Sequence, residues 1–114
     1  MCKIAFTGYF YLMELSVKTI DCRGFIISRH CQKRMDIREI LLDEIIETIN
    51  YGELITKYEE DKPFPSNLIL KFVNGRPLHV MVAQDPVSLQ RILITAYWPD
   101  YNTWQPDFRN KKNG

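Results

Sequence analysis

The sequence predicts an α+β fold, with N-terminal helices packed on a four-stranded antiparallel sheet supplied by the second half of the chain. Before Gly52 the apolar residues recur at helical spacing, whereas after it they lie in short runs typical of strands. An Asn74-Gly75 pair separates two of these runs, which is a strong short-range signal for a β-hairpin. The chain has 114 residues, 46% of them hydrophobic, so it is long enough for one domain with its own core.

Two helices are expected before Gly52. Ser28 can cap a first helix from about Arg29 to Asp36, because a serine hydroxyl accepts a hydrogen bond from an otherwise unpaired N–H group of the first turn. A second helix is expected from about Leu41 to Asn50, and Gly52 provides its stop. The apolar side chains of this second helix share one face, at Leu42, Ile45, Ile46 and Ile49.

Four strands are expected after Gly52, and the hairpin between the second and third defines their register. They cover residues 53–60, 67–73, 76–84 and 91–97. A two-residue type I′ turn pairs Val73 with Arg76 and, three residues further out, Leu70 with His79. A proline-containing loop at residues 61–66 and a second loop at residues 85–89 separate the other strands.

The first 15 residues stand apart from this pattern. They form an apolar and aromatic run, but Thr7-Gly8 interrupts it and no small-residue cleavage site follows, so the run does not indicate a signal peptide. It is also too short to span a membrane. It forms either a short extra strand or a poorly ordered extension. Residues 16–109 are then the single α+β domain, and residues 110–114 are a polar tail.

Composition indicates a cytoplasmic protein and leaves the choice of partner open. The formal net charge is +1 and the pI is about 7.7, so charge neither argues for nucleic acid nor excludes it. The three cysteines, Cys2, Cys22 and Cys31, are odd in number and form no C-x-x-C pair, which argues against a disulfide framework and a zinc site. We interpret Cys31 as a small core residue on the first helix.

A possible basic stripe lies on the first helix. His30, Arg34 and Arg38 are spaced four residues apart, so they share one face if a single helix carries all three. A helix that ends at Asp36 leaves Arg38 outside the stripe. A solvated basic face is the more common use of this pattern, and phosphate binding is the functional one.

A polar set is expected on one face of the sheet. Alternation places His79 and Met81 together, and on the next strand it places Thr95 and Tyr97 together. The apolar sets expected to meet beneath the helices are Leu78, Val80 and Val82, and Ile92, Ile94 and Ala96. His79, Thr95 and Tyr97 would then share the opposite face, which we expect to be concave or semi-exposed. For a single histidine in an apolar strand, the more common interpretation is a core residue satisfied by a neighbour.

These residue types suit one kind of chemistry. Histidine and tyrosine can move protons, and arginines such as Arg76 at the hairpin turn can hold an anionic phosphate. The chain has no Gly-rich phosphate loop and no G-x-S-x-G elbow, so P-loop hydrolysis and the α/β-hydrolase mechanism are excluded. Two histidines and scattered acids do not indicate a catalytic metal site, and no cofactor is expected.

Several blocks of residues, taken in order, resemble a known family. The blocks are His30-x-x-x-Arg34-Met35-x-x-Arg38, Gly52-Glu53, Tyr58-Glu59-x-Asp61-Lys62-Pro63-x-Pro65-Ser66, Gly75-Arg76-Pro77-Leu78-His79-Val80, Ile94-Thr95-x-Tyr97-x-Pro99 and Trp104-x-x-Asp107. They resemble the small bacterial family called domain of unknown function 4258, over roughly Ile26 to Arg109. The sequence departs from the family at Glu39, where glycine is usual, and near Leu41, where a serine or threonine usually caps the next helix.

That family is similar to toxins of the barnase–EndoU–colicin–RelE (BECR) superfamily. The resemblance therefore implies a RelE-like fold, with N-terminal helices on a four-stranded antiparallel sheet. It also implies metal-independent RNA cleavage, often by the toxin of a toxin–antitoxin pair. The implied partners are RNA, including ribosome-bound mRNA, and a cognate antitoxin protein, with no membrane and no metal.

The leading hypothesis is an endoribonuclease in which the ribose 2′-hydroxyl attacks the adjacent phosphate. His79 or His30 would be the base, Tyr97 or the other histidine the acid, and Thr95 would orient a partner. The candidate phosphate- and RNA-binding residues are Arg34, Arg38 and Arg76.

Two alternatives stay open. A non-catalytic RNA- or protein-binding module would use the same face, together with exposed aromatics at Tyr101, Trp104 and Phe108. Those aromatics have a structural interpretation as well, a tail packed over the edge of the sheet. A degenerate toxin that kept the fold and lost activity is the other alternative.

Overall fold

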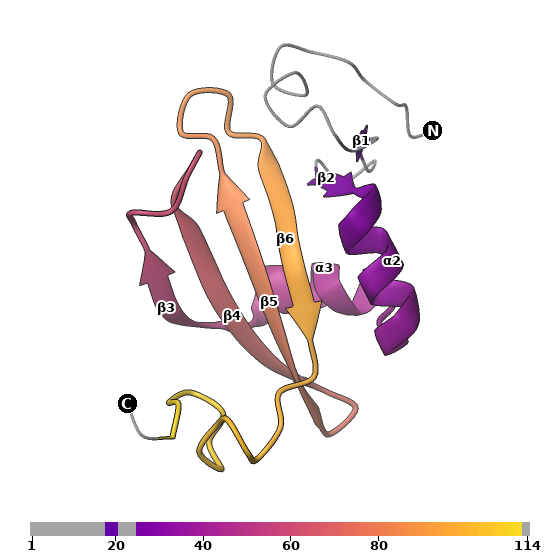
Figure 1. Cartoon of the computed structure of the whole chain (residues 1–114), viewed down its shortest axis with the longest axis vertical. Coiled ribbons are helices and arrows are strands. Elements are labelled where there is room, and N and C mark those ends of the chain that lie inside the picture. The colour runs from indigo at the N-terminus through magenta and orange to yellow at the C-terminus, as the bar shows by residue number, and fades with distance from the viewer. Residues whose placement is uncertain (1–17, 21–24, 113–114) are drawn as a thin grey trace.

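The computed structural model describes residues 18–20 and 25–112, which form one sheet and two helices (Figure 1). The strands are β1 (Lys18–Ile20), β2 (Phe25–Ser28), β3 (Glu53–Tyr58), β4 (Ser66–Val73), β5 (Arg76–Gln84) and β6 (Arg91–Tyr97), and the helices are α2 (Arg29–Arg38) and α3 (Leu42–Tyr51). The extension or extra strand expected at residues 1–15 lies outside the described residues. Within the described ranges, no helix is long and apolar enough to cross a membrane.

The sheet is larger than the sequence predicts and is mixed. Its strand order is β1-β2-β6-β5-β4-β3. Strands β3 to β6 pair antiparallel, as predicted, but β2 pairs parallel with β6, and β1 adds an antiparallel strand beyond β2. The prediction of a purely antiparallel, four-stranded sheet is therefore wrong. The missed strand is the run Phe25, Ile26 and Ile27, whose side chains are all buried, so it lacks the alternation that marks a half-exposed strand.

The hairpin register is confirmed. Val73 lies opposite Arg76, and Leu70 lies opposite His79. Asn74 and Gly75 have φ values of 53° and 83°, the two positive angles that a type I′ turn requires.

The first helix begins as predicted and ends later. The Ser28 hydroxyl accepts a hydrogen bond from the Cys31 N–H at 3.0 Å, which caps α2. The helix continues through Arg38 and ends at Glu39, which adopts the left-handed conformation with φ 56° and ψ 48°. Arg38 is therefore on the same helix as His30, and the expectation of an end at Asp36 is wrong.

A glycine is required where the second helix ends. Gly52 follows α3, and a Cβ atom built there would lie 2.8 Å from the Leu70 carbonyl oxygen and 2.7 Å from Ile69 Cγ2. The chain at Gly52 thus passes so close to β4 that a larger residue would push the two apart.

The main core lies between the helices and one side of the sheet. The largest buried contributions come from both helices and from four strands: Phe25, Ile27, Cys31, Met35, Ile40, Ile45, Ile69, Val73, Leu78, Val80, Val82, Leu93 and Ala96. Cys31 is buried, as predicted. On the same side, the Lys71 ammonium pairs with the Glu47 carboxylate of α3 at 2.8 Å, so Lys71 points away from the His79 face.

One detail of the core differs from the sequence prediction. The pairing of β5 with β6 shifts register between Met81 and Val82, so Met81 lies opposite Thr95 but Val82 lies opposite Leu93. Leu93 therefore joins the main core, and Ile94 is 41% exposed. The expectation that Ile94 packs beneath the helices is wrong, because a β-bulge inserts one residue and reverses the alternation beyond it.

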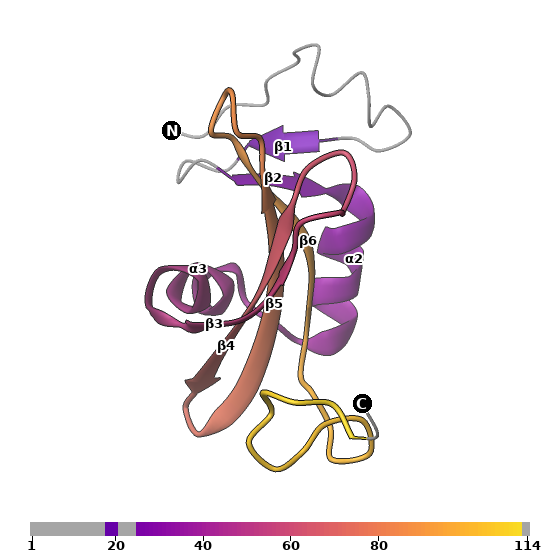
Figure 2. The ribbon, with the colours of Figure 1, turned by 90° about the vertical axis from the view of Figure 1, so that its left-hand side faces the viewer.

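A second core lies on the other side of the sheet. Figure 2 shows α3 and the chain after β6 on opposite sides of the sheet. We call residues 101–112 the C-terminal segment. Its Trp104 and Phe108 are 5% and 3% exposed and pack on Leu68 and Leu70 of β4. These two aromatics are therefore buried, and only Tyr101 of the three is exposed, which favours the packed-tail interpretation over three exposed aromatics.

Candidate functional site

His79 is the centre of the polar set, and it is completely buried. Its exposed fraction is 0%, because the C-terminal segment covers the face of β5 from which it projects. The ring of Trp104 lies edge-on to the imidazole, with ring centroids 4.4 Å apart. The expectation of a concave or semi-exposed face at His79 is wrong, because a segment 25 residues further along the chain folds over it.

The hydrogen bonds of His79 define its tautomer. Nε2 lies 2.8 Å from the Phe108 carbonyl oxygen, which can only accept, so Nε2 carries the proton. Nδ1 of the neutral ring is then an acceptor, and the Tyr97 hydroxyl, 3.2 Å away, donates to it. Both ring nitrogens are thus occupied by groups of the protein itself.

Burial keeps both members of this pair neutral. It lowers the pKa of His79, and the hydrogen bond to the Phe108 carbonyl opposes that shift. Burial also raises the pKa of Tyr97 to about 12; nearby Tyr58 adds to the rise and the Arg38 guanidinium opposes it. At neutral pH the site therefore holds an uncharged imidazole and a protonated phenol.

Arg38 is the charged residue that the structure brings to this pair. Its Nη1 donates to the Ala96 carbonyl oxygen at 2.7 Å and to Thr95 Oγ1 at 3.3 Å. These bonds join the last turn of α2 to the end of β6 and hold the guanidinium close enough to influence Tyr97. Thr95 thus orients an arginine rather than a histidine. Arg38, Thr95 and Tyr97 are all half-buried, so each keeps some contact with solvent.

The remaining two members of the stripe lie further along α2. His30 and Arg34 are exposed, and neither forms a hydrogen bond or an ion pair with any residue in the described ranges. A step of four helical residues rises about 6 Å, so Arg34 lies about one turn from Arg38, and His30 about two. The structure therefore places the stripe on one helix but brings only Arg38 to the His79–Tyr97 pair.

Arg76 is connected to the same end of α2 through Trp98. Its guanidinium carbon lies 4.0 Å from the centre of the Trp98 ring. Trp98 in turn donates from Nε1 to the Arg38 carbonyl oxygen at 2.8 Å. Arg76 is exposed, so its charge stays in solvent while its plane stacks on the indole.

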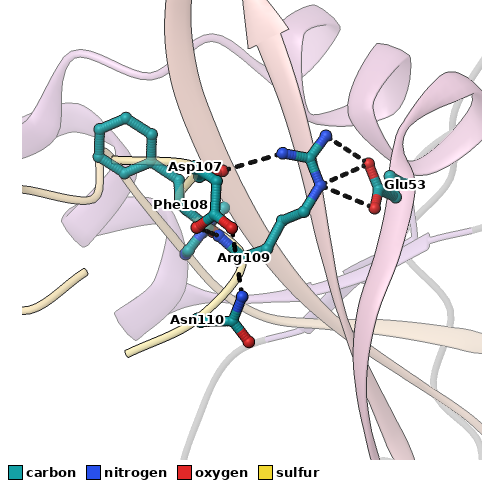
Figure 3. Close-up of polar contacts among 6 residues, drawn as sticks. Glu53, Asp107, Phe108, Arg109 and Asn110 are labelled. Atoms are coloured by element: carbon teal, nitrogen blue, oxygen red, sulfur yellow. Dashed lines mark hydrogen bonds and ion pairs between the residues drawn. The ribbon is translucent and has the colours of Figure 1, made fainter. Parts of the chain in front are cut away.

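The C-terminal segment is fastened at its far end as well. The Arg109 guanidinium forms a bidentate pair with the Glu53 carboxylate of β3, the closest atoms being 2.7 Å apart (Figure 3). Figure 3 shows the Phe108 ring pointing away from this pair. Arg109 thus binds the edge strand β3, while its neighbour Phe108 packs in the second core.

Sequence reasoning named Trp104 and Phe108, as exposed aromatics or as a packed tail, but it did not place them over His79, and it missed Trp98. Trp98, Trp104 and Phe108 orient Arg38 or enclose His79, yet none follows from strand alternation. The available signal was composition: a tail with one tryptophan, one tyrosine and one phenylalanine among polar residues is more apolar than a solvated tail requires.

Two hollows lie away from the candidate site on the described part of the molecule. A hollow of about 560 Å³ lies against α3, lined by Ile46, Glu47 and Tyr51 among others, and a second lies beside β3 and β4. Neither contains a residue of the candidate site. Within the described ranges, no group of three or more His, Cys, Asp or Glu side chains is placed to hold a metal ion.

Fold and site together define a small α+β protein whose polar site is built by one helix and two strands of a mixed sheet. The sequence matches the family described as Domain of unknown function (DUF4258) over residues 27–98, which is more than half of the chain. The protein therefore belongs to this family, and the resemblance is confirmed. The match contains Arg38, His79 and Tyr97 but not the C-terminal segment. No curated protein and no solved structure matches the chain.

Proposed function

We propose that this protein binds RNA at the surface formed by α2 and the end of β6 and cleaves it without a metal ion. The observation that carries the proposal is the bonding of Arg38 to Thr95 and to the Ala96 carbonyl, directly before Tyr97 on β6, with Tyr97 hydrogen-bonded to the buried His79. A fixed cation beside a protonated hydroxyl suits a phosphodiester, which needs its negative charge held and its leaving oxygen protonated.

The burial of each residue at the site indicates its proposed role in the reaction. His79 has no free nitrogen and positions Tyr97, which is itself only half-buried. In the proposed reaction, Arg38 and Arg34 hold the phosphate, and solvent water accepts the proton of the 2′-hydroxyl, because His79 has no free nitrogen and His30 lies about two helical turns from Arg38. The 2′-oxygen attacks phosphorus, and the bond to the 5′-oxygen breaks as Tyr97, whose O–H turns from His79 Nδ1 to that oxygen when RNA binds, protonates it. The products are a 2′,3′-cyclic phosphate and a 5′-hydroxyl.

The biological role proposed with this chemistry is that of a toxin in a toxin–antitoxin pair, with a RelE-like (BECR) fold. The support is the membership of the DUF4258 family, which resembles such toxins, and the antiparallel arrangement of β3 to β6 beside N-terminal helices. The partner in this role is a cognate antitoxin protein, and the substrate is cellular RNA, free or on ribosomes.

The proposal is tested by RNA cleavage in EDTA with purified protein. Tyr97→Phe removes the proposed acid and should lower the rate by about 100-fold or more, as is usual for loss of a general acid. Arg38→Gln should lower it by a similar factor. Lys33→Gln is the matched control, because Lys33 is an exposed cation of α2 outside the stripe. A folded wild-type protein that cuts no RNA, alone or on ribosomes, would refute catalysis.

The toxin role has its own test. Induced expression of the wild type in a bacterial host should arrest growth and produce new RNA ends, whereas Tyr97→Phe should do neither. Growth arrest by both variants, with intact RNA, would contradict a ribonuclease toxin.

A second candidate is a non-catalytic RNA-binding module on the same surface. It is favoured by the complete burial of His79 with both nitrogens engaged, which is the environment of a structural histidine. This candidate predicts RNA binding that depends on Arg38 but no cleavage in any variant.

A further inference from the structure

Three aromatic rings form a partly exposed cluster beside the candidate site. Phe72 of β4 and Tyr101 flank Phe108, with ring centroids 6.2 Å and 5.0 Å from it. Phe108 is 3% exposed, but Phe72 is 45% exposed and Tyr101 is 64% exposed. We call Phe72, Tyr101 and Phe108 the aromatic cluster. Its central ring is held by the core, and its two outer rings present surface to solvent.

Two contacts connect this cluster to the proposed acid. The Phe108 carbonyl oxygen binds His79 Nε2, and the His79 ring lies edge-on to Tyr97 with centroids 5.2 Å apart. The cluster and Tyr97 are thus separated by one buried side chain. Tyr101 also follows Tyr97, the last residue of β6, by only four residues, so a short stretch of chain joins the cluster to the proposed site.

Charges of both signs surround the cluster, with Asp100 and Asp107 directly before Tyr101 and Phe108, and two lysines further along the segment. Lys111 and Lys112 lie at the end of the same segment, and both are exposed. Lys111 lies 5.8 Å from the centre of the Trp104 ring, and no carboxylate in the described ranges pairs with either lysine. The nearby Asp107 carboxylate is already engaged, since it accepts from the Arg109 backbone N–H and from the Asn110 side chain.

We propose that Tyr101 and Phe72 form a base-stacking subsite for single-stranded RNA next to the proposed cleavage site. This inference rests on the proposed function and adds its substrate class. Exposed rings beside unpaired lysines are what a single strand uses, because its bases are free to stack on aromatic faces while its phosphates meet cations. A duplex keeps its bases stacked within the helix and cannot use such a ring.

The test is binding of a fluorescein-labelled 2′-O-methyl adenylate hexamer, followed by anisotropy. The probe cannot be cut through its 2′-oxygen, so binding is measured apart from chemistry. Tyr101→Ala should weaken binding by about 5- to 150-fold, the usual effect of losing one base–aromatic stack. Tyr101→Phe should restore affinity to within about 2-fold, since the ring is what stacks. Tyr51→Ala is the matched control, because Tyr51 is a comparably exposed tyrosine on α3.

Each result of the binding experiment either supports or overturns the stacking subsite. A loss at Tyr101→Ala with rescue by Tyr101→Phe supports the subsite, even if the wild type cuts no RNA and the catalytic proposal fails. Equal affinities for Tyr101→Ala and Tyr51→Ala overturn the subsite, even if EDTA-resistant cleavage upholds the catalytic proposal. Failure of the wild type to bind the hexamer, or tighter binding of a duplex of the same length, also overturns it. Binding of a protein but not RNA through Tyr101 would assign the cluster to a protein partner instead.

Discussion

Replacement of His79 by alanine should release the C-terminal segment as well as abolish any activity. His79 is the only described side chain that joins the backbone of this segment to β5, through the 2.8 Å bond to the Phe108 carbonyl. Its removal leaves that buried carbonyl without its donor and opens a space beneath Trp104.

The size of the effect can be worked from these contacts. A buried polar group left unsatisfied costs about 1 to 3 kcal/mol. The lost edge-on contacts with the rings of Trp104 and Tyr97 are worth about 0.5 to 1.5 kcal/mol each. The Tyr97 hydroxyl is half-buried and can turn to water, so it adds little. We expect a loss of about 2 to 6 kcal/mol in the free energy of unfolding, a large part of the stability of a small domain.

Two measurements check this expectation. Urea unfolding should show a lower midpoint for His79→Ala, and limited proteolysis should show new cuts within residues 101–112. His79→Gln should recover part of the loss, because its amide N–H can donate to the Phe108 carbonyl. A change below about 1 kcal/mol, with the segment still resistant to protease, would refute the reasoning. The consequence for activity assays is practical: loss of function in His79→Ala does not identify a catalytic group, whereas Tyr97→Phe removes one oxygen atom.

Three further predictions concern stability, each read from urea unfolding. Burial holds the pKa of His79 below its ordinary value of 6.5, so on acidification the unfolded chain takes up a proton first. The free energy of unfolding should therefore fall from about pH 6.5 down to the folded-state pKa. His79→Gln should flatten this slope, and an equally steep slope in that variant would contradict the assignment. Glu39→Gly should stabilise the protein by about 1 kcal/mol, because Glu39 has φ 56° and only glycine adopts this conformation without a steric penalty; an unchanged or lower midpoint would count against strain at this position. Leu41→Ser should raise the free energy of unfolding by about 1 kcal/mol, because Leu41 is the exposed N-terminal cap of α3 and its side chain cannot accept a hydrogen bond. The Glu44 carboxylate already accepts from the Leu41 backbone N–H, which is one half of a capping box. No gain in stability would show that this half suffices.

The last two of these predictions explain the departures from the family pattern. Glycine, which is usual at the position of Glu39, suits the left-handed end of α2, and a serine or threonine near Leu41 suits the start of α3. Here Glu39 closes α2 with backbone bonds to the Asp36 and Met35 carbonyls, and Glu44 supplies one half of a capping box. The helix junction thus forms with less favourable residues, and the site that begins at Arg38 keeps its geometry.

Local features of this fold were determined by the sequence alone, because their physics is local. Asn74-Gly75 favours two positive φ angles, and this turn sets the pairing of Leu70 with His79. Ser28 caps α2 through a bond to a residue three positions on, and Gly52 ends α3. The shared stripe of His30, Arg34 and Arg38 follows in the same way from helical spacing once the helix is long enough.

Only the tertiary structure decided which candidate residues meet. The bulge opposite Met81 and Val82 exchanges Leu93 for Ile94 in the core, and no pattern within β6 announces it, because a bulge depends on the partner strand. The parallel pairing of β2 with β6 joins segments more than 60 residues apart. The burial of His79 depends on the C-terminal segment, whose path over β5 is set by the fit of Trp104 and Phe108 against β4. Such long-range packing has no signature in spacing, and it makes His79 the support of Tyr97 rather than an exposed group.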